Sequence, residues 1–159
     1  MTSPQPTTSA EPSRPSAPGA GALYDALGVE HATIYGYGIV SAHSTPDDNW
    51  LVSAAISEHR ERRESLIAML DAQSVEPPPA APGYLLPSVV NDPTEAAELA
   101  VQMERDSAVA WRAVLEQADT EDDRTFAVAA LRQSAVLAAR WQTLLGTWPV
   151  TDAFPGGPE

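Results

Sequence analysis

The chain has 159 residues, a typical size for one domain with its own hydrophobic core. It contains no cysteine and no lysine, which excludes disulfides, zinc–thiolate sites, cysteine nucleophiles and lysine Schiff bases. The formal net charge is −13, so neither nucleic acid nor an anionic membrane surface is an expected partner.

Residues 1–19 are rich in Ser, Thr and Pro and contain few large apolar side chains. Such a segment cannot offset the chain entropy lost on folding, so we expect a disordered tail. It lacks the basic start and the apolar stretch of a secretory signal, which makes the cytoplasm the expected location. No apolar run reaches the roughly 18 residues of a membrane span, so no membrane association is expected.

Apolar residues at helical spacing predict four helices, over residues 20–43, 47–74, 93–118 and 121–146. Thr45-Pro46 and Asp92-Pro93 each place an N-capping side chain directly before a proline, a pattern typical of helix starts. Thr120 is a candidate N-cap for the fourth helix and Gly146 a candidate C-cap. No segment alternates polar and apolar residues as a strand does, so the predicted fold class is all-α.

The lengths of the connections predict how the helices are arranged. Helices 1 and 2 are joined by a short link, and so are helices 3 and 4, which favours two antiparallel hairpins. Residues 75–92 form a much longer link that can span ~60 Å, whereas a helix of this size is only ~39 Å long. The link can therefore cross the whole bundle, as in ferritin-like four-helix bundles. We expect its apolar residues, Tyr84, Leu85, Leu86, Val89 and Val90, to pack along the helices.

The predicted domain organisation follows from these elements. A disordered tail over residues 1–19 precedes a helical bundle over residues 20–148, and a flexible C-terminal tail covers residues 149–159.

Three glutamates interrupt the apolar stripes of the predicted helices. Glu30 shares a face with Leu23, Leu27 and Tyr37, and Glu104 shares one with Val101 and Trp111. Glu58 lies on a stripe with Leu51, Ala55, Arg62 and Met69. Carboxylates are almost never buried unless they are paired or bind a metal, so these side chains indicate either a metal site or a core ion-pair network.

The segments Ala22–Tyr37 (ALYDALGVEHATIYGY) and Ser57–Glu64 (SEHRERRE) resemble a ferritin-like family of bacterial proteins of unassigned function. The resemblance covers roughly residues 20–148. It implies that Glu30 and Glu104 match the single glutamates that the first and third helices contribute in members with a di-metal centre.

The sequence departs from the di-metal pattern in two helices. Helix 2 should carry Glu-x-x-His, but it reads Glu58-His59-Arg60-Glu61, with glutamate at the expected histidine position. Helix 4 has no Asp, Glu or His between Arg124 and Val150. A di-iron centre needs ligands from all four helices, so the departure argues against a standard centre.

Two interpretations of the inward charges remain open. In one, Glu30, Glu58 and Glu104 form a vestigial metal site; in the other, Arg62 neutralises them as a core ion pair. The arginine favours the second interpretation because it opposes a bound cation. His59 is expected at the solvated rim of the bundle.

The favoured function is a non-enzymatic binding or self-association module with a degenerate metal site and no cofactor. The alternative is a carboxylate-ligated metal protein that binds iron or manganese and has oxidase or peroxide-handling activity. A weaker hypothesis is a small-ligand binder near Tyr37 and Trp111. A second apolar face on helix 1 predicts a homodimer; it comprises Tyr24, Gly28, Tyr35 and Ile39.

Overall fold

The structure is a computed structural model that describes residues 12–157. These residues form four long helices and one short 3-10 turn, with no strand among them. The elements are α1 (Pro18–His43), η1 (Pro46–Asp48), α2 (Asn49–Ala72), α3 (Pro93–Gln117) and α4 (Glu121–Leu145). The predicted all-α class is confirmed, and each predicted helix is present close to its expected bounds.

The helix ends show why the local sequence signals succeeded in most places. The Asp92 side chain accepts a hydrogen bond from the Glu95 amide at 2.9 Å, and Thr120 accepts one from the Asp123 amide at 3.0 Å. Gly146 ends α4 in the left-handed conformation, with φ of 66°. The exception is Thr45, whose hydroxyl donates to Asp48 at 2.6 Å and caps no helix. A 3-10 turn follows it, and α2 therefore begins only at Asn49.

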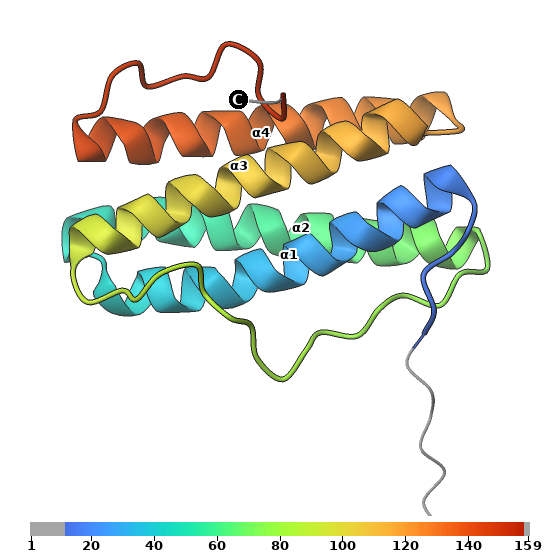
Figure 1. The fold of residues 1–159 in the computed structure, drawn as a ribbon, viewed down its shortest axis with the longest axis horizontal. Helices are drawn as coiled ribbons and strands as arrows, with labels where there is room; N and C mark the ends of the chain where they lie inside the picture. Colours follow the sequence, from blue (N-terminus) through green and yellow to red (C-terminus); the bar gives the residue numbers. More distant parts are fainter. Residues whose placement is uncertain (1–11, 158–159) are drawn as a thin grey trace, which may run out of the picture.

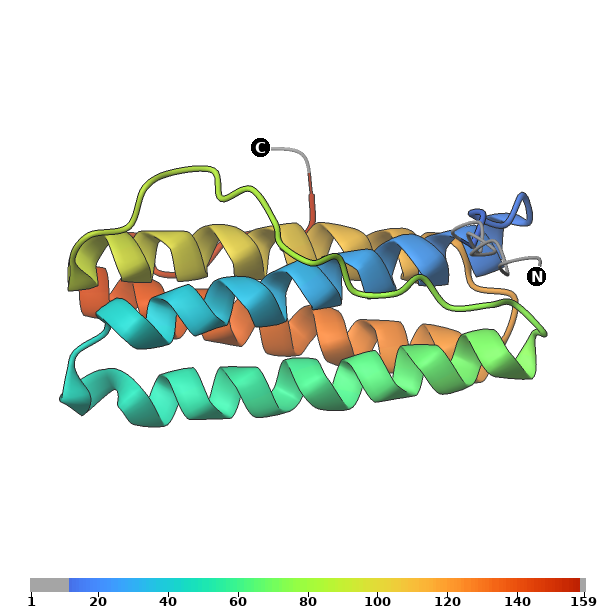
Figure 2. The same cartoon turned by 90° about the horizontal axis from the view of Figure 1, so that it is seen from below.

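The helices form two antiparallel hairpins, α1 with α2 and α3 with α4 (Figure 1). The connection from α2 to α3 returns along the length of the bundle, so that α2 and α3 run in the same direction (Figure 2). The helix pairs in close contact are α1 with α2, α1 with α3, and α3 with α4. The two hairpins and the long crossover were both predicted from the lengths of the connections.

The buried interior consists of two apolar clusters separated by a polar layer. One cluster lies around Tyr37, Leu51 and Trp141, and the other lies around Leu27, Leu66 and Trp111. Between them, the buried polar residues follow one another at helical spacing; they are Glu30, Thr33, His59, Arg62, Glu104, Ser107 and Ser134. The apolar clusters on both sides hold the four helices together and fix this layer in place.

The crossover packs on the bundle through only some of its apolar residues. The Tyr84 ring lies 5.5 Å from the Tyr35 ring of α1, and Val90 is buried. Leu85 is fully exposed and Val89 is 75 % exposed, so the prediction that all five apolar residues pack is wrong for these two. Neighbouring side chains of an extended chain point to opposite sides, so Leu85 and Val89 face solvent while Tyr84 and Val90 beside them pack on the bundle.

Both ends of the described chain contact the helices. Before α1, Arg14 binds Asp25 at 2.8 Å and the carbonyl of Pro12 accepts from the Tyr24 hydroxyl at 2.6 Å. The predicted disorder of residues 1–19 falls largely on residues 1–11, which lie outside the described residues. None of the helices in the described part of the chain combines the length and hydrophobicity that crossing a bilayer requires.

Candidate functional site

The polar layer at the centre of the bundle brings together charged side chains from three helices. Glu30 comes from α1, His59 and Arg62 from α2, and Glu104 from α3. Glu30, His59 and Glu104 are completely buried and Arg62 is 3 % exposed. The fourth helix contributes uncharged side chains, the buried Ser134 and, nearer the surface, Gln133. The layer is the strongest candidate site because burying four ionisable groups is costly unless they neutralise one another.

His59 lies between the two buried carboxylates and uses both ring nitrogens. Its Nδ1 atom is 2.6 Å from Oε2 of Glu30, and its Nε2 atom is 3.0 Å from Oε1 of Glu104. A carboxylate oxygen only accepts hydrogen bonds, so both ring nitrogens satisfy their partners only when each carries a proton. The geometry therefore fits a positively charged imidazolium that bridges α1 and α3.

The surroundings of His59 act in opposite directions on its pKa. Burial of the ring lowers the pKa, but the charges and hydrogen bonds of Glu104 and Glu30 outweigh burial and raise it from 6.5 to about 9. His59 is therefore protonated at neutral pH, which agrees with the two short contacts.

Three aromatic side chains extend the hydrogen-bond network at both ends. The Tyr37 hydroxyl donates to Oε1 of Glu104 at 2.5 Å and accepts from the Trp141 indole at 3.0 Å. At the other end, the Trp111 indole donates to Oε1 of Glu30 at 2.8 Å. Burial and the adjacent Glu104 raise the pKa of Tyr37 well above its usual value, so the phenol keeps its proton and remains a donor.

Arg62 is the second buried cation, and it connects the layer to the surface. Its Nη1 atom donates to Ser134 at 2.8 Å and lies 3.9 Å from Oε1 of Glu30. Its Nη2 atom donates to Glu58 and to Gln133, both at 3.3 Å. With His59 protonated, two buried cations face two buried carboxylates, so the layer is balanced in charge.

Of the predicted site residues, the structure buries Glu30, Glu104 and Arg62 together in the layer, whereas Glu58 lies outside it. The Glu58 side chain is 31 % exposed and lies at the rim, where it contacts Arg62. Glu104 is paired with His59, whereas the sequence prediction assigned its neutralisation to Arg62. The prediction of a solvated His59 is wrong, because the inward stripe of α2 passes through Ala55, His59, Arg62 and Leu66.

The spacing of α2 contained the signal that would have identified His59. Positions 55, 59, 62 and 66 are four, three and four residues apart, which is the spacing of a helix face. The same apolar neighbours also fit a stripe through position 58, so spacing alone left Glu58 and His59 as competing choices.

The donor set does not fit the di-metal centre that the family resemblance implies. A histidine ligand needs one ring nitrogen free for the metal, whereas both nitrogens of His59 face carboxylates. In the part of the chain that the structure describes, no three His, Asp or Glu side chains are placed to hold an ion together. Among residues 12–157, the buried side-chain atoms without a hydrogen-bond partner are Oε2 of Glu104 and Oγ of Ser107, and two oxygens from one helix are too few for such a centre.

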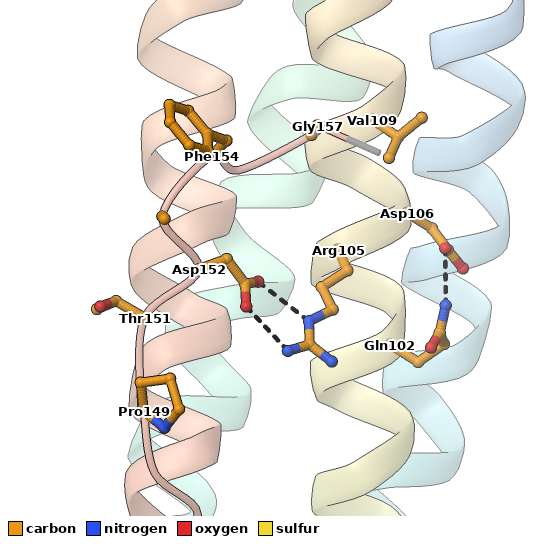
Figure 3. A pocket seen from close by; sticks show the side chains of 11 residues that line it. Gln102, Arg105, Asp106, Val109, Pro149, Thr151, Asp152, Phe154 and Gly157 are labelled. Carbon is orange, nitrogen blue, oxygen red and sulfur yellow. Dashed lines mark hydrogen bonds and ion pairs between the residues drawn. The ribbon is translucent and has the colours of Figure 1, made fainter. Parts of the chain in front are cut away.

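A second candidate is a pocket of about 430 Å³ between α3 and the C-terminal segment, shown in Figure 3. Arg105 of α3 binds Asp152 at 3.0 and 3.1 Å, and Gln102 donates to Asp106 at 2.8 Å. Further along, Arg112 donates to the carbonyl of Gly156 at 3.1 Å. The contacts of Arg105 and Arg112 hold the C-terminal segment against α3, so this segment forms one wall of the pocket.

Comparison with known proteins gives a family but no activity. Residues 22–159 match the family model described as a domain of unknown function, DUF4439. The chain is 58 % identical to a conserved hypothetical protein, rv2844, from Mycobacterium tuberculosis, whose crystal structure it matches with a TM-score of 0.80. The match covers 86 % of this chain and 96 % of that one. No curated protein matches the chain. The chain therefore belongs to the DUF4439 family, whose function is unknown.

Proposed function

We propose that this protein is a ferritin-like bundle whose core charges are balanced without a metal, and that it acts as a non-enzymatic binding module. The two hairpins, the long crossover and the inward glutamates on α1 and α3 support the ferritin-like assignment. Membership of a family of unknown function leaves the activity open, so the proposal rests on the site itself.

The observation that carries the proposal is the bridge from Glu30 through His59 to Glu104. An imidazolium and a guanidinium already neutralise the two buried carboxylates, so a divalent cation would leave an excess of buried positive charge. To act as a ligand, His59 would also have to give up one of its carboxylate partners.

Catalysis at this layer is disfavoured because a substrate has no access to its side chains. Glu30, His59 and Glu104 are completely buried, so a substrate cannot touch them unless the helices separate. A general acid or base must come within hydrogen-bond reach of the group it serves. We therefore assign the layer a structural role and place the binding activity on the surface.

Self-association through α1 stays a prediction. Two members of the proposed face are already used by the chain itself, since Tyr24 bonds to Pro12 and Tyr35 packs against Tyr84. A dimer through this face would have to include the crossover in its interface. Because the chain itself already uses part of the α1 face, we place the binding surface of the module on another face of the bundle.

Metal analysis of the purified protein tests the proposal. The protein is incubated in turn with Fe(II), Mn(II) and Zn(II), desalted, and analysed for bound metal by mass spectrometry. We expect far less than one ion per chain for every metal. A stoichiometric content that falls in a Glu30→Gln or Glu104→Gln variant would overturn the proposal and support a carboxylate-ligated metal protein.

A further inference from the structure

The outer face of α4 carries positive charge on a strongly acidic protein. Arg132 and Arg140 are exposed, and no hydrogen bond or ion pair within the described residues involves either guanidinium. From Arg124 to Thr151 the chain contains no acidic residue, although its net charge is −13. These arginines are therefore not neutralised by their own helix.

Apolar surface lies between and beside the two arginines. Val136 lies one turn from each of them and is 44 % exposed. On one side is a hollow of about 300 Å³ between α4 and α2, with Leu137 and Val136 in its wall. On the other side is a hollow of about 340 Å³ that Ala135 and Ala139 line. Arg132 and Arg140 border both hollows. Each hollow also has one carboxylate in its wall, Glu58 in the first and Asp152 in the second, and each of these is already paired with another arginine, Arg62 and Arg105 respectively.

We propose that this face, which we define by Arg132, Val136 and Arg140, binds an amphiphilic carboxylate, meaning a carboxylate with an apolar chain. Guanidinium groups bind carboxylates through paired hydrogen bonds, and the chain would cover Val136 and one of the hollows. The inference rests on the proposed function, because it names the surface and ligand class of that binding module.

Charge argues against a second copy of the protein as the occupant. The arginines are eight residues apart, about 12 Å along the helix. An antiparallel pair of α4 helices centred on Val136 would place Arg132 of one copy beside Arg140 of the other. These two positive charges from different copies would repel each other. A ligand of opposite charge removes this conflict.

Calorimetric titration with decanoate, kept below its micelle concentration, tests the inference. We expect saturable binding to the full chain, at least about tenfold weaker binding to the R132Q/R140Q variant, and no saturable binding of acetate. The control is R60Q/R124Q, which removes the same charge elsewhere on the surface and should bind decanoate like the wild type. Val136→Asp should also abolish binding, since it places an acid on the apolar part of the face.

Several results would overturn the inference. One is the absence of saturable decanoate binding, and another is an equal affinity for decanoate in R132Q/R140Q and in the R60Q/R124Q control. A third is a dimer in sedimentation that Val136→Asp dissociates. The last would mean that a second copy occupies the face. The metal content of the same preparations reports separately on the core, so a failure of this inference is distinguishable from a failure of the proposed function.

Discussion

The Nδ1 atom of His59 lies 2.6 Å from Oε2 of Glu30, with both side chains completely buried. This contact joins α2 to α1, and the opposite ring nitrogen joins α2 to Glu104 of α3. Since α2 and α3 are not among the helix pairs in close backbone contact, the imidazole gives these two helices a direct hydrogen-bonded link. The histidine therefore acts as both a cation and a crosslink at the centre of the bundle.

Replacing His59 with glutamine should strongly destabilise the protein. Glutamine can still hydrogen-bond, but it leaves two buried carboxylates facing a single arginine, and breaking a buried pair typically costs about 3–5 kcal/mol. Urea denaturation at pH 7 measures the change. His43→Gln, at the end of α1, is the matched control and should change stability by less than about 0.5 kcal/mol. A loss below about 1 kcal/mol for His59→Gln would contradict the ionic role.

Stability should fall between pH 6.5 and about 9. The pKa of His59 is raised in the folded state, so its contribution is fully present below 6.5 and is lost as the pH rises through about 9. A rise of this size corresponds to roughly 3 kcal/mol, and the other buried groups will modify the figure. Urea midpoints across this range measure the effect, and His59→Gln should show a flatter profile. Identical profiles for the two proteins would rule out titration of His59 as the cause.

The sequence predicted the helices and three of the inward charges, Glu30, Arg62 and Glu104, because these features depend on local patterns. Caps such as Asp92 and Thr120 act within three residues, and Glu30 and Glu104 each interrupt a single apolar stripe. The pairing of these charges is not local. Tyr37 and Glu104 are 67 positions apart in the chain, so only the packing of α1 against α3 brings them together.

The C-terminal segment shows the same limit. The sequence predicts a flexible tail over residues 149–159. The described part of this segment contacts α3 through Asp152 and Arg105, which are 47 positions apart. A single sequence offers many arginines for each exposed aspartate, so this partner could not be chosen in advance.

Tyr37→Phe should destabilise the protein by about 1–3 kcal/mol. The substitution removes the donor to Oε1 of Glu104 and the acceptor for the Trp141 indole, and unsatisfied buried polar groups carry a cost of this size. Tyr35→Phe is the control, because Tyr35 is 40 % exposed and its ring contact with Tyr84 is retained. Thermal unfolding of both variants measures the difference. Equal stability of the two would show that the phenol of Tyr37 makes no net contribution.

Arg62→Ala should cost about 3–5 kcal/mol near neutral pH, because it leaves Glu30 with one cation fewer and removes the partner of Ser134. Arg63→Ala is the control, since Arg63 is half-buried, pairs with the exposed Glu64 and should contribute no more than about 1 kcal/mol. The metal content of Arg62→Ala should also rise above that of the wild type, because an opposing charge is gone. A variant as stable as the wild type without metal would contradict the role assigned to Arg62.

The most direct test is the protonation state of His59, measured by nitrogen-15 NMR of the imidazole in the intact protein at pH 7.5. A free histidine is mostly neutral at this pH, since its pKa is about 6.5. We expect both ring nitrogens of His59 to carry protons and to give the chemical shifts of an imidazolium, with slowly exchanging ring protons. A neutral ring with one unprotonated nitrogen, or a nitrogen shift that changes when Zn(II) is added, would contradict a metal-free core balanced by His59.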